Sequence, residues 1–239
     1  MFRFLWVIIT HFITGIHLHK VMKKALKANA SNNDKYNVAH YVAKTITKKS
    51  NCNVYVSGLE ELPNEDGYVL YSNHQGRYDA LGIFATHPRM LSVVLDEARS
   101  DVFIEGEFVD LVRGERLDKK NAKASYLTLK KVEERVKNKE NFLIFPEGFY
   151  SDNKNKLQEF HTGCMHLLKE THAPIVPVCL YDTYKVFNKA TILKVSCSIC
   201  YLKPIYYDEY KDKSYREIAE MIKSTIQDKI NELGNNKWR

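Results

Sequence analysis

Apolar and polar positions alternate along most of the chain with two distinct periods. Short runs rich in β-branched and aromatic residues predict strands, and longer stretches with apolar residues three and four positions apart predict helices. Strands that alternate with helices predict one α/β domain with a mostly parallel or mixed sheet flanked by helices. The predicted strands are 53–57, 68–71, 90–95, 141–145, 175–180 and 191–202, and the predicted helices are 77–87, 122–139, 157–171 and 214–233.

The first 50 residues follow a different pattern. Residues 4–18 are rich in large apolar side chains, which on a helix lie opposite a narrow polar stripe. A cluster of lysines follows directly, and this combination is typical of an amphipathic helix that lies on an anionic membrane surface. The stripe consists of Arg3, Thr10, Thr14 and His17, the apolar face of Phe4, Leu5, Ile8, Ile9, Phe12 and Ile16, and the cluster of Lys20, Lys23, Lys24 and Lys27.

Three other interpretations of this segment stay open. The pattern is compatible with a core helix, and also with a spanning helix, although residues 4–18 are fewer than the ~20 that spanning usually needs. A secretory signal peptide is disfavoured because the lysines lie between the apolar stretch and the small residues at 28–30. We therefore expect residues 1–50 to form an N-terminal helical membrane-associating segment and residues 51–239 to form the α/β domain.

Charge and cysteine content narrow the possible partners. The formal net charge of +7 favours an anionic partner, which can be nucleic acid, anionic lipid or a phosphorylated substrate. The cations are scattered and not interleaved with aromatic side chains in a recognised module, so nucleic-acid binding is not expected. The five cysteines are irregularly spaced, and Cys197 and Cys200 fall on opposite faces of a predicted strand. Neither a disulfide framework nor a zinc site is predicted, which fits a reducing location.

The motif with the clearest chemistry follows the second predicted strand. It reads Asn-His-Gln-Gly-Arg-Tyr-Asp over residues 73–79. A continuous helix does not bring His74 and Asp79 to one face, but a turn at Gly76 does. A carboxylate on one ring nitrogen fixes the tautomer of a histidine and stabilises the imidazolium formed when the other nitrogen takes a proton. The pair is therefore a candidate general base, although an isolated pair at this spacing also fits a loop histidine in an ordinary hydrogen bond.

Three further segments carry candidate binding residues. Residues 145–151 place Pro146, Glu147 and Gly148 at the end of a buried strand, where a glycine lets backbone amides approach a ligand. Residues 113–120 contain four cations that can bind phosphate. Residues 174–178 form a buried strand with prolines near its start. Taken singly, each segment also fits an ordinary strand end or a solvated loop.

Together and in this order, the four segments resemble the sequence blocks of the glycerophospholipid acyltransferase family, which includes the lysophosphatidic acid (1-acyl-sn-glycerol-3-phosphate) acyltransferases. Residues 157–163 also look like the segment that follows the third block in that family. Two positions depart from the pattern, because the third block of the family typically continues Thr-Arg where this chain has Phe149 and Tyr150. A lysine ahead of the family's second block also has no obvious match near Asp96.

The resemblance implies that His74, oriented by Asp79, takes the proton of an acceptor hydroxyl, which attacks the thioester of acyl-CoA or acyl carrier protein. The implied acceptor is the lysophospholipid 1-acyl-glycerol 3-phosphate and the product is phosphatidic acid. Acylation of glycerol 3-phosphate or of another lysophospholipid, and a catalytically weak lipid-binding scaffold, are the alternatives. No metal or bound cofactor is expected, and the expected location is the cytoplasmic face of a membrane. The implied substrate-binding residues are Asn73, Arg116 (on the acceptor phosphate), Pro146, Glu147 and Gly148.

Overall fold

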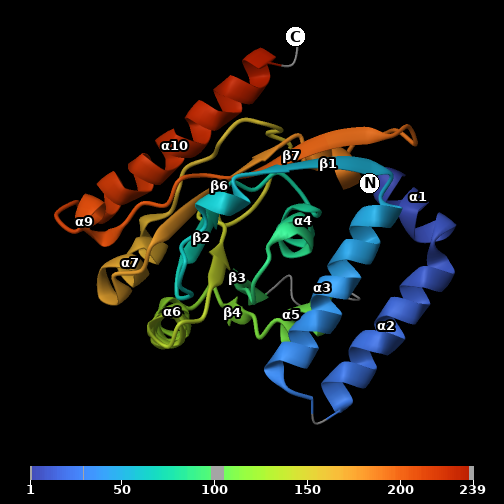
Figure 1. Ribbon diagram of the computed structural model, residues 1–239, viewed down its shortest axis with the longest axis horizontal. Helices are drawn as coiled ribbons and strands as arrows, with labels where there is room; N and C mark the ends of the chain where they lie inside the picture. The colour runs from blue at the N-terminus through green and yellow to red at the C-terminus, as the bar shows by residue number, and fades with distance from the viewer. Residues whose placement is uncertain (1, 29, 98–104, 237–239) are drawn as a thin grey trace.

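A seven-stranded mixed sheet lies at the centre of the computed structural model, which describes residues 2–28, 30–97 and 105–236 (Figure 1). The strand order is β1-β7-β6-β2-β5-β3-β4. Strands β6, β2, β5, β3 and β4 are parallel, whereas β7 runs antiparallel to β6 and β1 runs parallel to β7. The strands are β1 (Cys52–Ser57), β2 (Val69–Ser72), β3 (Ser92–Asp96), β4 (Glu115–Leu117), β5 (Phe142–Ile144), β6 (Ile175–Tyr181) and β7 (Val195–Tyr201).

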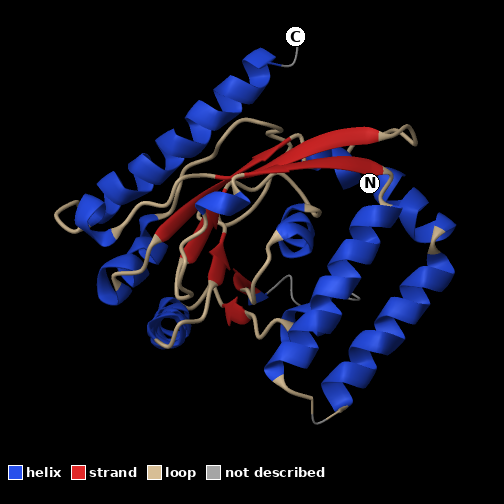
Figure 2. Cartoon of the chain, viewed as in Figure 1, coloured by secondary structure: helices blue, strands red, loops and turns tan. Residues whose placement is uncertain are grey.

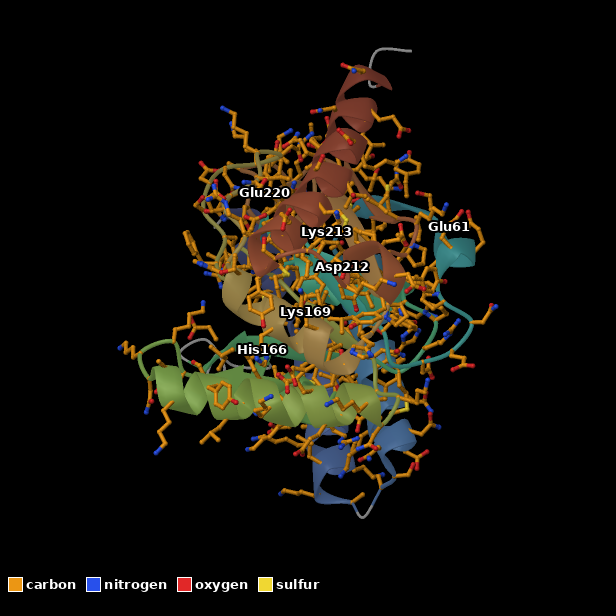
Figure 3. The ribbon with its side chains drawn as sticks, turned by 90° about the vertical axis from the view of Figure 1, so that its left-hand side faces the viewer. Glu61, His166, Lys169, Asp212, Lys213 and Glu220 are labelled. Carbon is orange, nitrogen blue, oxygen red and sulfur yellow. The ribbon has the colours of Figure 1, made fainter. Side chains whose placement is uncertain are left out.

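Helices cover both faces of the sheet (Figure 2). One core cluster packs α2, α3, α4 and α5 against one face, and a second packs α6, α7 and α10 against the other. Figure 3 shows this second side, with α10 above α7 and α7 above α6. The helices are α1 (Phe2–Thr10), α2 (Phe12–Lys27), α3 (Asn32–Lys49), η1 (Leu59–Glu61), α4 (Asp79–Thr86), α5 (Glu105–Leu111), α6 (Ala122–Lys137), η3 (Thr162–Met165), α7 (His166–Thr171), α8 (Tyr184–Phe187), α9 (Tyr207–Tyr210) and α10 (Tyr215–Asn236).

Burial on both faces explains why the central strands are apolar throughout. Every residue of β6 is buried, with Val176 in the first cluster and Ile175 in the second. Successive side chains of a strand point to opposite faces, so a strand covered on both sides has no position left for a polar residue. The predicted fold class is confirmed, and the cysteines Cys197 and Cys200 do lie in different clusters.

The N-terminal prediction of one amphipathic helix is wrong in its geometry. The chain forms two helices, α1 and α2, which meet at His11 with a bend of 81°. The bend arises because α1 packs against α8, whereas α2 places Leu18 and Met22 in the core beside α3 and α5. Within the described residues no single helix has the length and apolar content of a membrane span, and only the bent pair α1 and α2 passes that test together.

Arg3 occupies a place that the helical pattern did not predict. Instead of lying on an exposed polar stripe, its side chain is fully buried, whereas most of the predicted apolar face is exposed. The predicted boundary near residue 50 falls between α3 and β1. Met22 and Val42, which precede it, belong to the same core cluster as residues of the sheet, so α2 and α3 pack as part of the α/β core.

The helix expected at 157–171 begins later than predicted. A 3-10 turn starts at Thr162 and the α-helix at His166. Residues 157–161 form no helix because they bond to another segment: the His161 N–H donates to the Pro146 carbonyl at 2.9 Å, and the Gln158 amide donates to Glu147. These tertiary hydrogen bonds therefore keep residues 157–161 out of the predicted helix.

Candidate active site

The sequence-predicted site residues follow the ends of neighbouring parallel strands. His74 follows β2, Glu147 follows β5, and Leu180 is the next-to-last residue of β6, which lies on the other side of β2. The carboxyl ends of parallel strands lie at one edge of a sheet, and in open α/β sheets ligands bind at that edge. The order β6-β2-β5 is therefore what brings residues more than 70 positions apart into contact.

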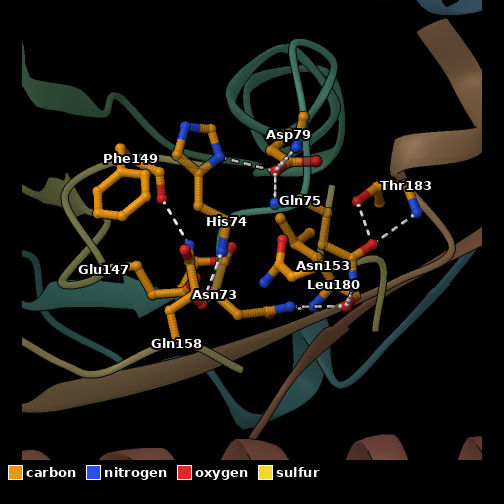
Figure 4. Close-up of polar contacts among 12 residues, drawn as sticks. Asn73, His74, Gln75, Asp79, Glu147, Phe149, Asn153, Gln158, Leu180 and Thr183 are labelled. Carbon is orange, nitrogen blue, oxygen red and sulfur yellow. Dashed lines mark hydrogen bonds and ion pairs between the residues drawn. The ribbon is translucent and has the colours of Figure 1, made fainter. Parts of the chain in front are cut away.

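His74 and Asp79 meet as the sequence predicted. The His74 Nδ1 atom lies 2.8 Å from Asp79 Oδ2, and Asp79 is the first residue of α4 (Figure 4). Because the carboxylate is an acceptor, Nδ1 carries the proton and Nε2 presents its lone pair. The described residues place no hydrogen-bond partner on Nε2, and the His74 side chain is 16% exposed while that of Asp79 is 0% exposed. The imidazole can therefore accept a proton from a bound ligand.

Backbone amides fix the Asp79 carboxylate. The same Oδ2 atom accepts the N–H groups of Gln75 at 2.5 Å and Gly76 at 2.8 Å. Its position in the first turn of α4 adds the positive end of the helix dipole. These donors hold the chain between His74 and Asp79 in a tight turn, which is the geometry that a five-residue spacing requires.

Glu147 holds the backbone of His74 from the neighbouring strand. Its Oε1 accepts the His74 N–H at 3.1 Å, and its Oε2 accepts the Gln158 amide at 2.6 Å (Figure 4). Burial raises the pKa of Glu147 above its usual value, while the bonds from Gln158 and His74 oppose that shift. Since both carboxylate oxygens are engaged inside the protein, the geometry favours a positioning role over the direct substrate contact that the sequence suggested.

Asn73 and Gln75 fasten the other side of the loop to β6. The Asn73 amide donates to the Leu180 carbonyl at 2.9 Å and accepts the Leu180 N–H at 2.8 Å. Gln75 donates to Asn155 and Leu180, and its Oε1 accepts both the N–H and the hydroxyl of Thr183. Both side chains are 1% exposed. The structure thus turns Asn73, expected to bind substrate, toward the sheet, where it positions His74.

Two aromatic rings enclose the imidazole of His74. Phe145 stacks on it with ring centroids 4.3 Å apart, and Tyr150 meets it edge-on at 4.8 Å. Such contacts restrict rotation of the imidazole about its side-chain bonds. Tyr150, one of the two departures from the family pattern, therefore lies directly against the candidate base.

Gly148 and Lys119 form the part of the site beyond Glu147. Gly148 has a positive φ of 71°, and a Cβ atom there would meet His161 Cδ2 at 3.1 Å. A side chain at position 148 is therefore strained and crowded. Lys119 donates to the Gly148 carbonyl and pairs with Asp96 at 2.9 Å. Pro146 is buried and contributes its carbonyl to His161.

Arg116 does not join this group. It lies on β4, three strand positions from β2, which corresponds to about 14 Å at the usual strand spacing. Its guanidinium bonds to Asp110 at 2.7 Å. The sequence-based choice of Arg116 within the basic segment is therefore not supported by the geometry, which brings Lys119 to the site instead. Strand β4, which the sequence analysis did not predict, ends at Leu117, so Lys119 follows a parallel strand at the same edge of the sheet as His74 and Glu147.

Gln75 and Gln158 were not predicted as site residues. Gln75 lies inside the motif at 73–79, but its partners at 155, 180 and 183 are 80 or more positions away. No local pattern identifies such partners. In the described ranges, no group of three or more His, Cys, Asp or Glu side chains is arranged to hold a metal ion.

Comparison with known proteins identifies the family of the chain. The family model described as Acyltransferase matches residues 53–181, which include every strand that carries a site residue. The chain belongs to the acyltransferase family. Over the whole structure the chain is similar to the 1-acyl-sn-glycerophosphate (LPA) acyltransferase PlsC from Thermotoga maritima, with a TM-score of 0.80, 18% identity, and coverage of 99% of this chain and 98% of that one.

Three curated relatives of the chain carry the name 1-acyl-sn-glycerol-3-phosphate acyltransferase. The protein of Cocos nucifera is 28% identical over 130 residues, which are 53% of this chain and 42% of that protein. The protein of Limnanthes alba is 26% identical over 175 residues, 71% of this chain and 60% of that one. The protein of Escherichia coli is 28% identical over 171 residues, 70% and 69% respectively. The matched part thus spans about half the length of the plant relatives.

Proposed function

We propose that this acyltransferase-family protein transfers a fatty acyl chain from a thioester, acyl-CoA or acyl carrier protein, to the free hydroxyl of 1-acyl-glycerol 3-phosphate. The observation that carries the proposal is the buried Asp79 carboxylate at 2.8 Å from His74 Nδ1, which leaves Nε2 to accept a proton. The names of the relatives support the choice of acceptor.

The chemical step follows from that arrangement. His74 Nε2 takes the proton of the acceptor hydroxyl while its oxygen attacks the thioester carbonyl carbon. The carbon–sulfur bond breaks, the sulfur leaves as a thiolate that receives the proton from His74, and an ester remains on the acceptor. Asp79 stabilises the imidazolium formed between these events. Glu147, Asn73 and Gln75 hold the loop so that the imidazole needs no rearrangement.

The direct test is acyl transfer in detergent micelles. Purified protein is incubated with a labelled acyl thioester and a panel of acceptors: 1-acyl-glycerol 3-phosphate, glycerol 3-phosphate, and lysophospholipids with larger head groups. We expect phosphatidic acid to form fastest. If another acceptor reacts faster, that acceptor becomes the proposed substrate. Phe149 and Tyr150, which replace the family's usual Thr-Arg, are the reason for including this alternative. Absence of transfer from both carriers to every acceptor would contradict the enzyme and favour a lipid-binding scaffold.

For the acceptor phosphate we propose Lys119, because its ammonium group lies beside Gly148. Lys119→Ala is expected to raise the acceptor KM roughly 10- to 100-fold, the loss of one charge-assisted hydrogen bond, with little change in the donor KM. Arg116→Ala is the matched comparison, since it removes a cation from the same segment that bonds to Asp110. A larger acceptor effect from Arg116→Ala would restore the sequence-based assignment.

We also propose that the protein binds the cytoplasmic face of an anionic membrane through α1 and α2. Support comes from the exposed apolar side chains of both helices, which are followed on α2 by Lys20, Lys23, Lys24 and Lys27 around one surface hollow. All five cysteines are free thiols, as expected on the reducing side of a membrane. The exposed apolar residues are Phe2, Leu5, Ile8, Ile9, Phe12, Ile13 and Ile16.

A further inference from the structure

The loop between α8 and β7, residues 188–194, presents two large apolar side chains to solvent. Ile192 is 51% exposed and Leu193 is 74% exposed. Exposed apolar residues are ordinary when they occur singly, but two adjacent ones at a loop tip form a protruding apolar point. Asn188 at the start of the loop lies against Gly76, but the exposure of Ile192 and Leu193 at the tip needs another account.

The polar backbone of this loop is turned toward the protein. The carbonyls of Thr191 and Leu193 accept hydrogen bonds from Arg3 Nη1 at 2.8 and 2.7 Å, and the Ile192 carbonyl accepts the Asn51 amide at 3.1 Å. The Leu193 N–H donates to the Thr191 hydroxyl at 3.1 Å. An irregular segment enters an apolar medium only when its backbone groups are already bonded, because each unbonded group costs several kcal/mol there. At the apolar tip, the three carbonyls of residues 191–193 and the Leu193 N–H meet that condition.

Arg3 joins the loop to α1. Its side chain is fully buried, and its remaining donors bond to the carbonyls of Val186, Ser50 and Asn51 at 2.8 to 2.9 Å. Five hydrogen bonds from one guanidinium fix α1 and the loop relative to each other. In Figure 1 the loop before β7 and helix α1 lie at the same end of the molecule, beside the N-terminus. The apolar tip is therefore held beside α1.

Charge indicates the chemistry of the partner. The sequence contains no Asp or Glu between residues 1 and 33 or between residues 183 and 207. Lys189 and Lys194 flank the apolar tip and are exposed. Apolar side chains bordered by cations, without an anion nearby in the sequence, match an anionic phospholipid surface, where the apolar residues enter the interface and the lysines meet phosphates.

We propose that the 188–194 loop is a second membrane contact, in which Ile192 and Leu193 insert into an anionic bilayer while Arg3 holds the loop in a fixed position beside α1. This inference rests on the proposed membrane association and extends it from one helical surface to two separate points. The helical surface and the loop tip, held rigidly relative to each other, together define the orientation of the protein on the membrane. With the helical surface alone, rotation of the protein about the helix axis is less restricted.

The first test is partition onto vesicles of equal phosphatidylglycerol and phosphatidylcholine. The double variant Ile192→Ser with Leu193→Ser is expected to bind roughly 10-fold more weakly than wild type, because two apolar side chains no longer leave water. The matched control is Tyr126→Ser with Leu127→Ser on α6, which removes two side chains that are each 53% exposed and far along the chain from the loop. Its binding should equal that of wild type. Equal binding by all three proteins would overturn the inference.

The second test reports the position of the tip directly. In Leu193→Trp, we expect the added tryptophan emission to shift to shorter wavelength on these vesicles and to be quenched by brominated lipid, whereas the indole in Leu127→Trp stays in water. Unchanged emission from Leu193→Trp, or a wild-type dimer that the double variant loses without vesicles, would overturn the membrane assignment.

Acyl transfer in detergent is measured in parallel with the Leu193→Trp variant, so that the two proposals fail separately. An active protein whose added indole at position 193 stays in water contradicts this inference alone. An inactive protein whose added indole inserts into the vesicles contradicts the proposed enzyme alone.

Discussion

His74→Ala is expected to lower kcat for acyl transfer by roughly 10²- to 10⁴-fold, the usual contribution of a positioned general base. The imidazole is the group whose Nδ1 is bonded to Asp79 at 2.8 Å and whose Nε2 faces the site. Initial rates in detergent micelles with saturating donor and acceptor give kcat directly, and single-turnover experiments separate the chemical step from product release.

The control for His74→Ala is another histidine substitution. His172 lies just before β6, at the opposite edge of the sheet from His74, and has φ of 55°. Asparagine tolerates that conformation, so His172→Asn should keep the wild-type kcat. Normal turnover by His74→Ala, with a normal circular dichroism spectrum, would remove His74 from the mechanism.

Asp79→Asn is expected to lower kcat by roughly 10³- to 10⁴-fold while the acceptor KM changes little. The amide group keeps an oxygen for the bonds that the Asp79 Oδ2 atom makes, but it has no charge to stabilise an imidazolium. Asp79→Ala should in addition destabilise the fold, because the buried N–H groups of Gln75 and Gly76 lose their acceptor at about 1 to 3 kcal/mol each.

The two Asp79 variants separate catalysis from stability. Urea unfolding should show a larger loss of unfolding free energy in Asp79→Ala than in Asp79→Asn, since asparagine keeps an oxygen that accepts the two N–H groups. Equal stability losses would indicate that the carboxylate does not hold the turn. A fully active Asp79→Asn would indicate that the pair acts without the negative charge.

Local patterns predicted most of the elements correctly. The two-residue period of buried strands and the three-to-four-residue period of helices depend on neighbours in the sequence, so β2, β5, β6, α6 and α10 are found close to their expected places. The turn between His74 and Asp79 was also predictable, because a five-residue spacing permits contact only when the chain turns. The order of blocks in the sequence indicated the family.

The assignment of roles within the site needed the fold. Lys119 and Arg116 are three positions apart in one basic segment, and only the end of β4 and the position of Asp110 decide which cation reaches Gly148. Asn73 was expected to contact the substrate. In the structure its side-chain amide group instead bonds to both the carbonyl and the N–H of Leu180, 107 positions away.

The sequence by itself determined the α/β class, the strand ends that carry His74 and Glu147, and the apolar N-terminal segment, because each depends on residues within one or two turns of chain. The tertiary structure alone decided that α1 and α2 bend at His11, that Arg3 is buried, and that Gln75 is held by Thr183. These features depend on carbonyls and amides brought together from segments 47 to 190 positions apart. Such contacts leave no periodic mark in the sequence, since each partner is an ordinary backbone group whose position is set only when the sheet order is formed.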